Sequence, residues 1–150
     1  YTLSLHDALP ISFAVIPNPA LRRQFERAMH GIVPHVNVLG LAACEAALRH
    51  GGDWHRELIA YLRGNRDRVA ATMASLPGVR MAPVEATYLA WIDVRDLRLA
   101  KPAAHFEAHG IGLSDGADFG APGWLRLNFG CPRATLDEAL TRFERAVRAA

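Results

Sequence analysis

Apolar side chains recur at helical spacing along the first half of the chain. They predict a helix over about residues 38–49 and a longer one over about 53–76, for which Asp53 is the expected N-cap. The apolar stripe of the longer helix is formed by Leu58, Leu62, Val69, Met73 and Leu76. Because a helix of this length is long for a small domain, we expect it to connect two domains.

The residues before these helices predict a short strand and a first helix. Residues 13–16 form an apolar run that ends at a proline. Asn18 followed by Pro19 is the pattern of an N-cap and a first helical residue, and Gly31 is expected to end that helix. Asn37 is the expected N-cap of the next helix.

The hydrophobic period changes after the long helix. Apolar runs predict four strands, with a helix between the second and the third: strands at 79–82, 88–94, 111–113 and 125–129, and the helix at 101–109. A last helix is expected to begin with a capping box formed by Thr135 and Glu138. It would bury a stripe made of Leu136, Leu140, Phe143 and Val147. The order β-β-α-β-β-α predicts an α+β unit with helices on one face of the sheet.

The segment WLRLNFGCPR, residues 124–133, is expected to be a strand that ends in a sharp turn. Since side chains alternate along a strand, Leu125, Leu127 and Phe129 share one face, and Arg126 and Asn128 share the other. A guanidinium there can hold a carboxylate by two parallel charge-assisted hydrogen bonds. Alternation alone favours a simpler interpretation, in which Arg126 lies on the wet face of a half-exposed sheet.

Composition limits the class of protein. The chain has 150 residues, of which 51% are hydrophobic and 21% charged, as in an ordinary globular protein. Its net charge of +2 gives no electrostatic case for nucleic-acid binding, and no apolar run approaches the length of a membrane span. The two cysteines, Cys44 and Cys131, do not indicate a disulfide framework and agree with a cytoplasmic protein.

Few residues suggest chemistry by their spacing. The seven histidines are scattered and form no metal-ligand cluster, so we expect no metal. Lys101 is the only lysine among 17 basic residues, and we interpret it as a solvated residue that opens a helix. Cys131 follows a strand and precedes a proline, which is typical of a turn residue rather than a nucleophile.

The first residues stand apart from the rest. Residues 1–12, YTLSLHDALPIS, resemble a translated sequencing-adapter artefact rather than any protein family. We expect them to be non-native and leave them out of the fold prediction. Packing of Leu3, Leu5 and Leu9 into the core as a paired strand would argue against this interpretation.

From residue 13 onward the chain resembles the C-terminal part of a fold-type-I pyridoxal-phosphate enzyme. It is similar to the class I/II aminotransferase family, and within that family to the cystathionine β-lyase, or C–S lyase, branch. Four segments carry the resemblance, the last two being specific in combination: AVIPNPALRRQF, GGDWHRELIAYLRGNRD, TYLAWIDVRDL and GLSDGADFGAPGWLRLNFGCPR. The resemblance implies a remnant of the large cofactor domain at 13–36, connecting helices at 37–76 and a small substrate-clamping domain at 77–150.

The resemblance also implies chemistry. The intact parent enzyme would use pyridoxal 5'-phosphate, act on amino acids and form a homodimer. Arg126 falls on the arginine that binds the substrate α-carboxylate in this family. Tyr88 and Ser114 fall where the cleft is expected, and Asn128 shares the face of Arg126, so these three are further candidates for substrate binding. Residues 30–37 are a candidate contact with a neighbouring subunit.

The resemblance places the Schiff-base lysine before residue 13, and Lys101 does not match its position. We therefore expect a truncated fragment of a pyridoxal-phosphate-dependent carbon–sulfur β-lyase that is inactive alone. A fragment of a class I/II aminotransferase is the first alternative, and a non-catalytic α+β ligand-binding domain is the second. The fragment interpretation predicts exposed apolar surface around residues 13–29, whereas a binding domain predicts a self-contained core.

Overall fold

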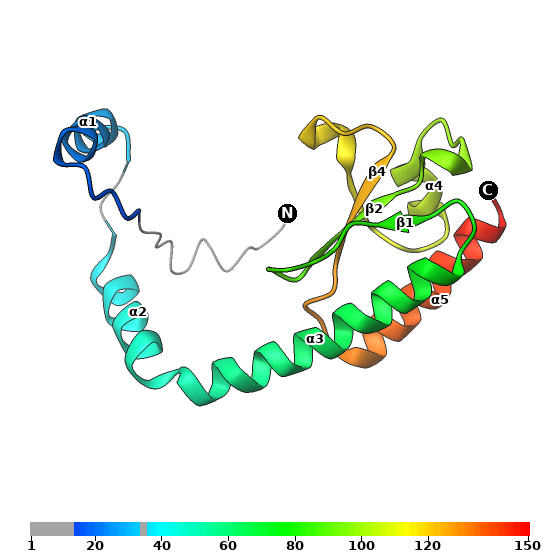
Figure 1. Ribbon diagram of the computed structural model, residues 1–150, viewed down its shortest axis with the longest axis horizontal. Coiled ribbons are helices and arrows are strands. Elements are labelled where there is room, and N and C mark those ends of the chain that lie inside the picture. The colour runs from blue at the N-terminus through cyan, green and yellow to red at the C-terminus, as the bar shows by residue number, and fades with distance from the viewer. Residues whose placement is uncertain (1–13, 34–35) are drawn as a thin grey trace. The chain divides into compact units, whose positions relative to one another are not determined.

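The chain folds as two units in the computed structural model, which describes residues 14–33 and 36–150 (Figure 1). The first unit extends to Arg56, and the second begins at Glu57. This boundary falls inside the predicted connector 37–76, and the finer division into three segments stays a prediction. The expectations for residues 1–12, including Leu3, Leu5 and Leu9, lie outside the described residues.

Asparagine side chains begin both helices that lie wholly within the first unit. Asn18 Oδ1 accepts hydrogen bonds from two backbone N–H groups at the start of α1 (Pro19–Met29). Asn37 Oδ1 accepts one from Gly40 at the start of α2 (Val38–His50). Both predicted caps are confirmed. The predicted strand at 13–16 is wrong for its described residues, 14–16, which pair with no strand in the described part of the chain.

The apolar side chains of α1 and α2 are largely exposed. Leu21 and Phe25, which helical spacing places on one face of α1, are 55% and 46% exposed. Gly40 is the only buried residue in these two helices. The expectation of exposed apolar surface is therefore confirmed for the described part of 13–29.

α3 (Gly52–Ser75) carries the predicted apolar stripe. The helix begins at Gly52, and Asp53 pairs with Arg56 one turn further on, so the prediction of Asp53 as N-cap is wrong. Val69 and Met73 enter the core of the second unit, as predicted. The position one turn before Val69 is taken by Asn65, which is fully buried.

The second unit contains a four-stranded antiparallel sheet with the order β1-β2-β4-β3. Its strands are β1 (Arg80–Met81), β2 (Leu89–Asp93), β3 (Ser114–Asp115) and β4 (Trp124–Asn128). The predicted strand at 111–113 is wrong. Gly110 has a φ of 79°, and the Ile111 N–H donates to the Phe106 carbonyl, so these residues close the preceding helix before β3 begins.

Helices cover one face of this sheet, as the order of elements predicted (Figure 1). α4 (Pro102–Ala108) contributes Phe106, whose ring centroid lies 4.5 Å from that of Phe143 on α5 (Arg133–Arg148). The predicted α5 stripe is confirmed, since Leu136, Leu140, Phe143 and Val147 are all buried. These helices share one apolar core with the inward side chains of β2 and β4, which are Ala90, Ile92, Leu125 and Leu127.

The start of α5 depends on another helix. The predicted capping box is wrong, because α5 begins at Arg133 and its N-cap position, Pro132, has no side-chain hydrogen bond. The Arg133 N–H instead donates to the hydroxyl of Tyr61 on α3, at 2.7 Å. A tertiary contact thus satisfies the first N–H of α5, which begins two residues before the cap that the sequence predicted at Thr135.

Candidate functional site

Arg126 lies on the sheet face opposite the helices. The alternation predicted for β4 is confirmed, because Leu125, Leu127 and Phe129 are buried whereas Arg126 is only partly buried. The strand register places Arg126 between Trp91 of β2 and Ser114 of β3. Side chains from three strands therefore meet around this guanidinium.

The guanidinium of Arg126 is held from two directions. Its Nη2 donates to Ser114 Oγ at 3.1 Å. Its Cζ lies 4.6 Å from the ring centroid of Phe119, which ends the 3-10 turn Gly116–Phe119. Among residues 14–33 and 36–150, no Asp or Glu carboxylate lies within ion-pair distance of Arg126. The positive charge is thus fixed in place without a negative partner in the described chain.

Three aromatic rings adjoin this arginine. Trp91 stacks on Trp124, with ring centroids 5.8 Å apart and planes at 17°. The rings of Trp91 and Phe119 meet nearly at right angles, with centroids 5.9 Å apart and planes at 84°. An apolar surround lowers the local dielectric, which strengthens the attraction between the guanidinium and an anion. The sequence analysis missed Trp91 and Phe119. The alternation of YLAWIDV, which puts Trp91 on the outward face, could have indicated the first.

Asn128 and Tyr88 lie at the far end of β4. Asn128 is exposed, and its Oδ1 accepts a hydrogen bond from the Gly130 N–H at 2.8 Å. The ring of Tyr88 packs over Gly130, where an added Cβ would come 3.1 Å from Tyr88 Cγ. The structure therefore brings Ser114 into contact with Arg126. It gives Asn128 and Tyr88 contacts with the following turn instead.

A buried amide on α3 holds that turn. Asn65 Nδ2 donates to the carbonyls of Phe129 and Cys131, at 2.9 and 3.0 Å, and the side chain is 0% exposed. Its Oδ1 is buried and finds no hydrogen-bond partner among the described residues. The sequence analysis missed Asn65. The signal was an amide at a position where the helical spacing of the α3 stripe calls for an apolar side chain.

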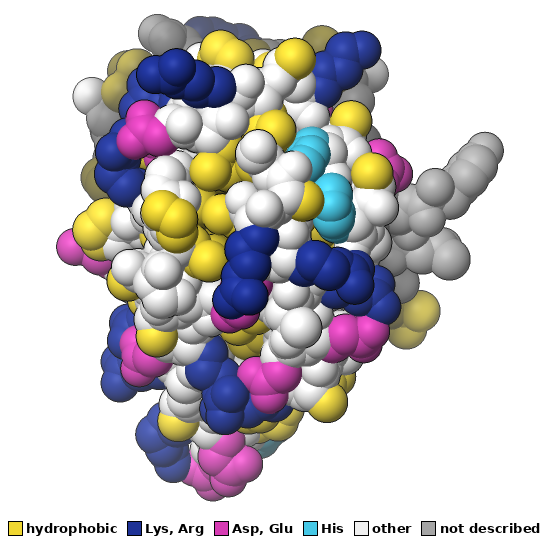
Figure 2. Space-filling model, turned by 90° about the vertical axis from the view of Figure 1, so that its right-hand side faces the viewer, with side chains coloured by type: hydrophobic (Ala, Val, Ile, Leu, Met, Phe, Trp, Pro, Cys, Tyr) yellow, Lys and Arg dark blue, Asp and Glu magenta, His cyan; other side chains and the backbone are white. Residues whose placement is uncertain are grey.

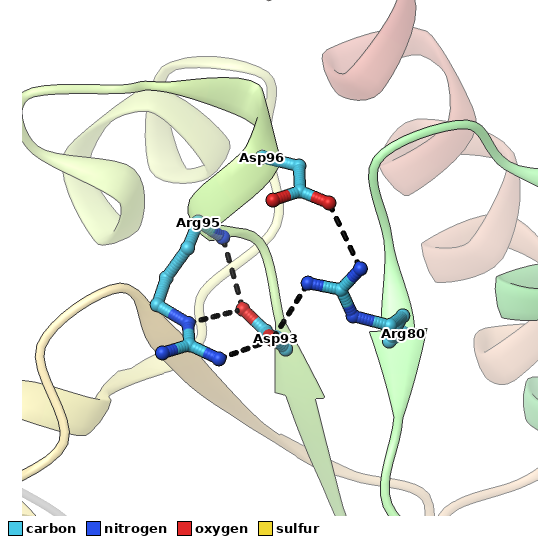
Figure 3. Close-up of polar contacts among 4 residues, drawn as sticks. All are labelled: Arg80, Asp93, Arg95 and Asp96. Carbon is cyan, nitrogen blue, oxygen red and sulfur yellow. Dashed lines mark hydrogen bonds and ion pairs between the residues drawn. The ribbon is translucent and has the colours of Figure 1, made fainter.

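A network of ion pairs lies at the other end of β2 and β4 (Figure 3). Asp93 is only 3% exposed, and both its oxygens accept from the Arg95 guanidinium, at 2.9 Å each. Arg80 bridges Asp93 and Asp96. The hydrogen bonds from Arg95, aided by Arg80, hold the pKa of the Asp93 carboxyl well below its usual range, although burial opposes them. The sequence analysis did not predict this network.

Histidine and arginine side chains gather on the face shown in Figure 2. His105 Nε2 lies 2.9 Å from the Ala146 carbonyl, and His109 Nδ1 lies 2.9 Å from the His105 carbonyl. Arg145 donates to the His109 carbonyl. These side chains satisfy carbonyls near the ends of α4 and α5, and the described residues contain no cluster of three metal-ligand side chains.

Neither Lys101 nor Cys131 has surroundings that favour a catalytic role. Lys101 is exposed at the N-cap position of α4 and has no side-chain capping bond. Burial raises the pKa of the Cys131 thiol, which disfavours the thiolate. No helix in the described ranges has both the length and the apolar character that crossing a bilayer requires.

Comparison with known proteins gives a family match along most of the chain. Residues 11–143 match the family described as aminotransferase class I and II. Cystathionine β-lyase of Corynebacterium glutamicum is 38% identical over 110 residues, which cover 71% of this chain and 30% of that protein.

Solved structures agree with this match. The crystal structure of OvoB has 48% identity and a TM-score of 0.90, over 95% of this chain and 38% of that one. Cystalysin from Treponema denticola, solved with a pyridoxal 5'-phosphate cofactor, has 27% identity and a TM-score of 0.78, over 90% and 36%. The chain spans between 30% and 38% of the length of these three proteins.

Proposed function

The chain belongs to the aminotransferase class I and II family, and on this basis we propose that the whole protein is a pyridoxal-phosphate-dependent carbon–sulfur β-lyase acting on amino acids. The similarity to a cystathionine β-lyase supports the reaction type. The cofactor in the related cystalysin structure supports pyridoxal phosphate. In such enzymes this cofactor supplies the electron sink for a carbanion at the substrate α-carbon.

The observation that carries the proposal is the environment of Arg126. Its guanidinium is partly buried, is fixed by Ser114 and Phe119, and has no carboxylate partner among the described residues. Such a group offers N–H donors to the planar carboxylate of an amino acid. Holding the α-carboxylate fixes the orientation of the α-carbon, which is the contribution of this chain to catalysis.

The residues of this chain do not fit a covalent attachment of pyridoxal phosphate. That attachment needs a lysine, and the only one in the sequence is Lys101. Lys101 is exposed at the N-cap position of α4 and is absent from the contacts that surround Arg126. We therefore assign substrate binding to this chain and no step of the cofactor chemistry.

The other predicted site residues take different parts in the proposal. Ser114 acts on the substrate through Arg126, since its hydroxyl accepts from the guanidinium. Tyr88, which is 48% exposed, remains a candidate for direct contact with the substrate. Asn128 stays a candidate through its amide nitrogen, because its Oδ1 accepts from the Gly130 N–H in the turn.

The proposal extends to assembly and location. A homodimer is supported by the exposed Ile32 and Val33, which lie within the predicted contact segment 30–37. These residues also line a cavity of about 750 Å³ in the first unit. A cytoplasmic location is supported by the free thiols of Cys44 and Cys131, which suit a reducing compartment. Residues 77–150 would form the small domain that closes on the substrate.

Product analysis of the whole protein tests the reaction. A β-lyase supplied with cystathionine releases a thiol, ammonia and pyruvate. The alternative, a class I/II aminotransferase, instead transfers the amino group to an added keto acid and releases no ammonia. A non-catalytic binding domain gives neither product. We expect the first outcome, and stoichiometric amino transfer without release of pyruvate would contradict the lyase assignment.

Substitution of Arg126 tests the site within the same assay. Arg126→Gln should lower kcat/KM by about 100-fold, since it removes the bidentate, charge-assisted bonds to the carboxylate. Arg148→Gln is the matched control, because Arg148 is exposed and pairs only loosely with Glu144, at 3.7 Å. Equal activity of the two variants would remove Arg126 from the site.

A further inference from the structure

We propose that Phe119 is a positioning residue whose ring sets the orientation of the Arg126 guanidinium for carboxylate binding. The inference rests on the proposed function for the identity of the ligand, and on geometry alone for the orientation of Arg126. The distance of 4.6 Å from Cζ to the ring centroid lies well within the range of about 6 Å for attraction between a cation and an aromatic face.

Phe119 and Ser114 restrain the guanidinium in different ways. The ring of Phe119 lies beneath the guanidinium carbon, Cζ, whereas Ser114 Oγ accepts from a single nitrogen, Nη2. A hydrogen bond to one nitrogen still allows the plane to rotate about that bond. Contact with a ring face opposes this rotation, so the two contacts together select one orientation. The N–H donors that Ser114 does not use then point in a defined direction before any ligand arrives, which favours binding by preorganisation.

The ring of Phe119 is itself held in place. The Phe119 ring makes an edge-to-face contact with Trp91, and Trp91 in turn stacks on Trp124. The turn that carries it is tightly built, because an added Cβ on Gly116 would lie 2.4 Å from the Ala121 carbonyl oxygen. Asp115 Oδ1 also accepts from the Ala117 N–H, at 2.9 Å. A ring fixed in this way can define the position of a side chain that rests on it.

Two observations separate this role from simple packing. Phe119 is 53% exposed and is not part of the buried core. Arg95 makes a comparable contact with Trp124, at 5.5 Å, but its guanidinium is bound to the Asp93 carboxylate. Within the described chain, Arg126 combines a fixed aromatic contact with the lack of an acidic partner. Arg133 over Tyr61 also has both features, but its guanidinium donates to the Tyr61 carbonyl, at 3.4 Å. That combination is what an external carboxylate requires.

Nuclear magnetic resonance of the full 150-residue chain tests the proposal. The arginine Nε–Hε signals are recorded in ¹⁵N-labelled protein, and the Arg126 signal is identified by its loss in Arg126→Lys. Sodium acetate is the probe, and sodium chloride at matched ionic strength is its control. We expect the Phe119 ring current to shift the Arg126 signal upfield, and acetate to perturb that signal selectively. The Arg133 signal is an internal reference, since its guanidinium lies 4.9 Å from the Tyr61 ring.

Variants that remove the aromatic ring and variants that keep it should differ in the Arg126 signal and in acetate affinity. Phe119→Leu should move the Arg126 signal towards its free position and weaken acetate binding by about two- to fivefold. Phe119→Tyr keeps the ring and should retain the wild-type shift and affinity. Phe119→Met replaces the leucine variant if the latter does not fold, with the same expectations.

The outcomes distinguish the inference from the proposed function. An unchanged acetate affinity in Phe119→Leu would overturn the positioning role and leave carboxylate binding in place. A moved Arg126 signal alone would not rescue the role, because loss of the ring removes its ring-current shift even if the guanidinium keeps its orientation. If acetate binds at Arg126 in neither the wild type nor any variant, the carboxylate-binding function fails, and the role of Phe119 in it fails as well. If acetate binds and only Phe119→Leu weakens it, both are supported.

Discussion

At the scale of single residues, arginines of the second unit differ in whether a carboxylate of the protein balances their positive charge. Arg95 and Arg80 share the buried carboxylate of Asp93, so their charges are used within the protein. Arg126 contacts a hydroxyl and a ring instead. Because an internal ion pair competes with an external anion, Arg126, which has no acidic partner among the described residues, is better suited than Arg80 or Arg95 to bind a carboxylate.

The Asp93 network predicts a dependence of stability on pH. The folded state lowers the pKa of Asp93, so its contribution to stability is fully present above the pKa of an unfolded aspartate, about 3.9, and is lost as pH falls through the lower pKa of the folded state. Asp93→Asn should reduce the free energy of unfolding at pH 7 by about 1–3 kcal/mol, since it weakens charge-assisted bonds.

Urea unfolding at pH 7 and at successively lower pH checks this expectation. The difference between wild type and Asp93→Asn should shrink as the solution is acidified below pH 4. Asp67→Asn is the control, because the exposed Asp67–Arg66 pair should contribute less than about 1 kcal/mol. A difference between wild type and Asp93→Asn that does not vary with pH would contradict the argument.

At the scale of elements, α3 holds the segment between β4 and α5. Tyr61 caps the first N–H of α5, and Asn65 binds two carbonyls of the turn that follows β4. These bonds join one face of α3 to backbone groups more than 60 residues away. The strand that carries Arg126 is therefore tied at its end to a helix, which limits how far the strand can shift.

Asn65→Ala should destabilise the second unit by about 2–3 kcal/mol. The substitution leaves the Phe129 and Cys131 carbonyls without their donor, and one of these bonds is fully buried. Ser75→Ala is the control on the same helix, because its hydroxyl makes only an exposed local bond. Equal unfolding midpoints for the two variants would show that the amide does not hold the turn.

At the scale of the whole molecule, apolar burial is uneven between the units. The second unit encloses a continuous core, whereas large apolar side chains of the first unit face solvent. Val38 and Leu48 of α2 are each 76% exposed, and Trp54 is 68% exposed. Apolar surface of this kind is typical of protein segments that normally contact further protein.

We therefore expect the 150-residue chain to bind an apolar dye and to self-associate. Replacement of both Val38 and Leu48 by lysine should reduce dye fluorescence and the sedimentation coefficient without changing the unfolding transition of the second unit. Arg22→Lys on α1, which leaves the apolar surface unchanged, is the control. A wild-type chain that is monomeric and binds no dye would contradict the expectation.

Local sequence patterns predicted much of this fold. Asn18 and Asn37 were identified as caps because a cap bonds to amides only two or three residues away. The alternation along β4 placed Arg126 on the outward face, since the period of a strand is two residues. The resemblance of the segments around Arg126 indicated the family, which the comparison confirmed over residues 11–143.

Other predictions were wrong where contacts between residues far apart in the sequence overrode a local sequence pattern. Thr135 does not cap α5, because the helix begins two residues earlier, where the Arg133 N–H donates to the hydroxyl of Tyr61 on another helix. The strand at 111–113 was displaced because Gly110 and Ile111 complete the end of α4. In each case the local motif was compatible with the sequence, and packing of the whole unit favoured another partner.

The sequence alone determined where most helices and strands lie and which face of β4 carries Arg126, because periodicity and capping depend on near neighbours. Only the tertiary structure decided what Arg126 contacts. Ser114 reaches it across paired strands, and the ring of Phe119 reaches it through a turn. Such contacts depend on the path of the backbone in space, which spacing along the chain does not specify.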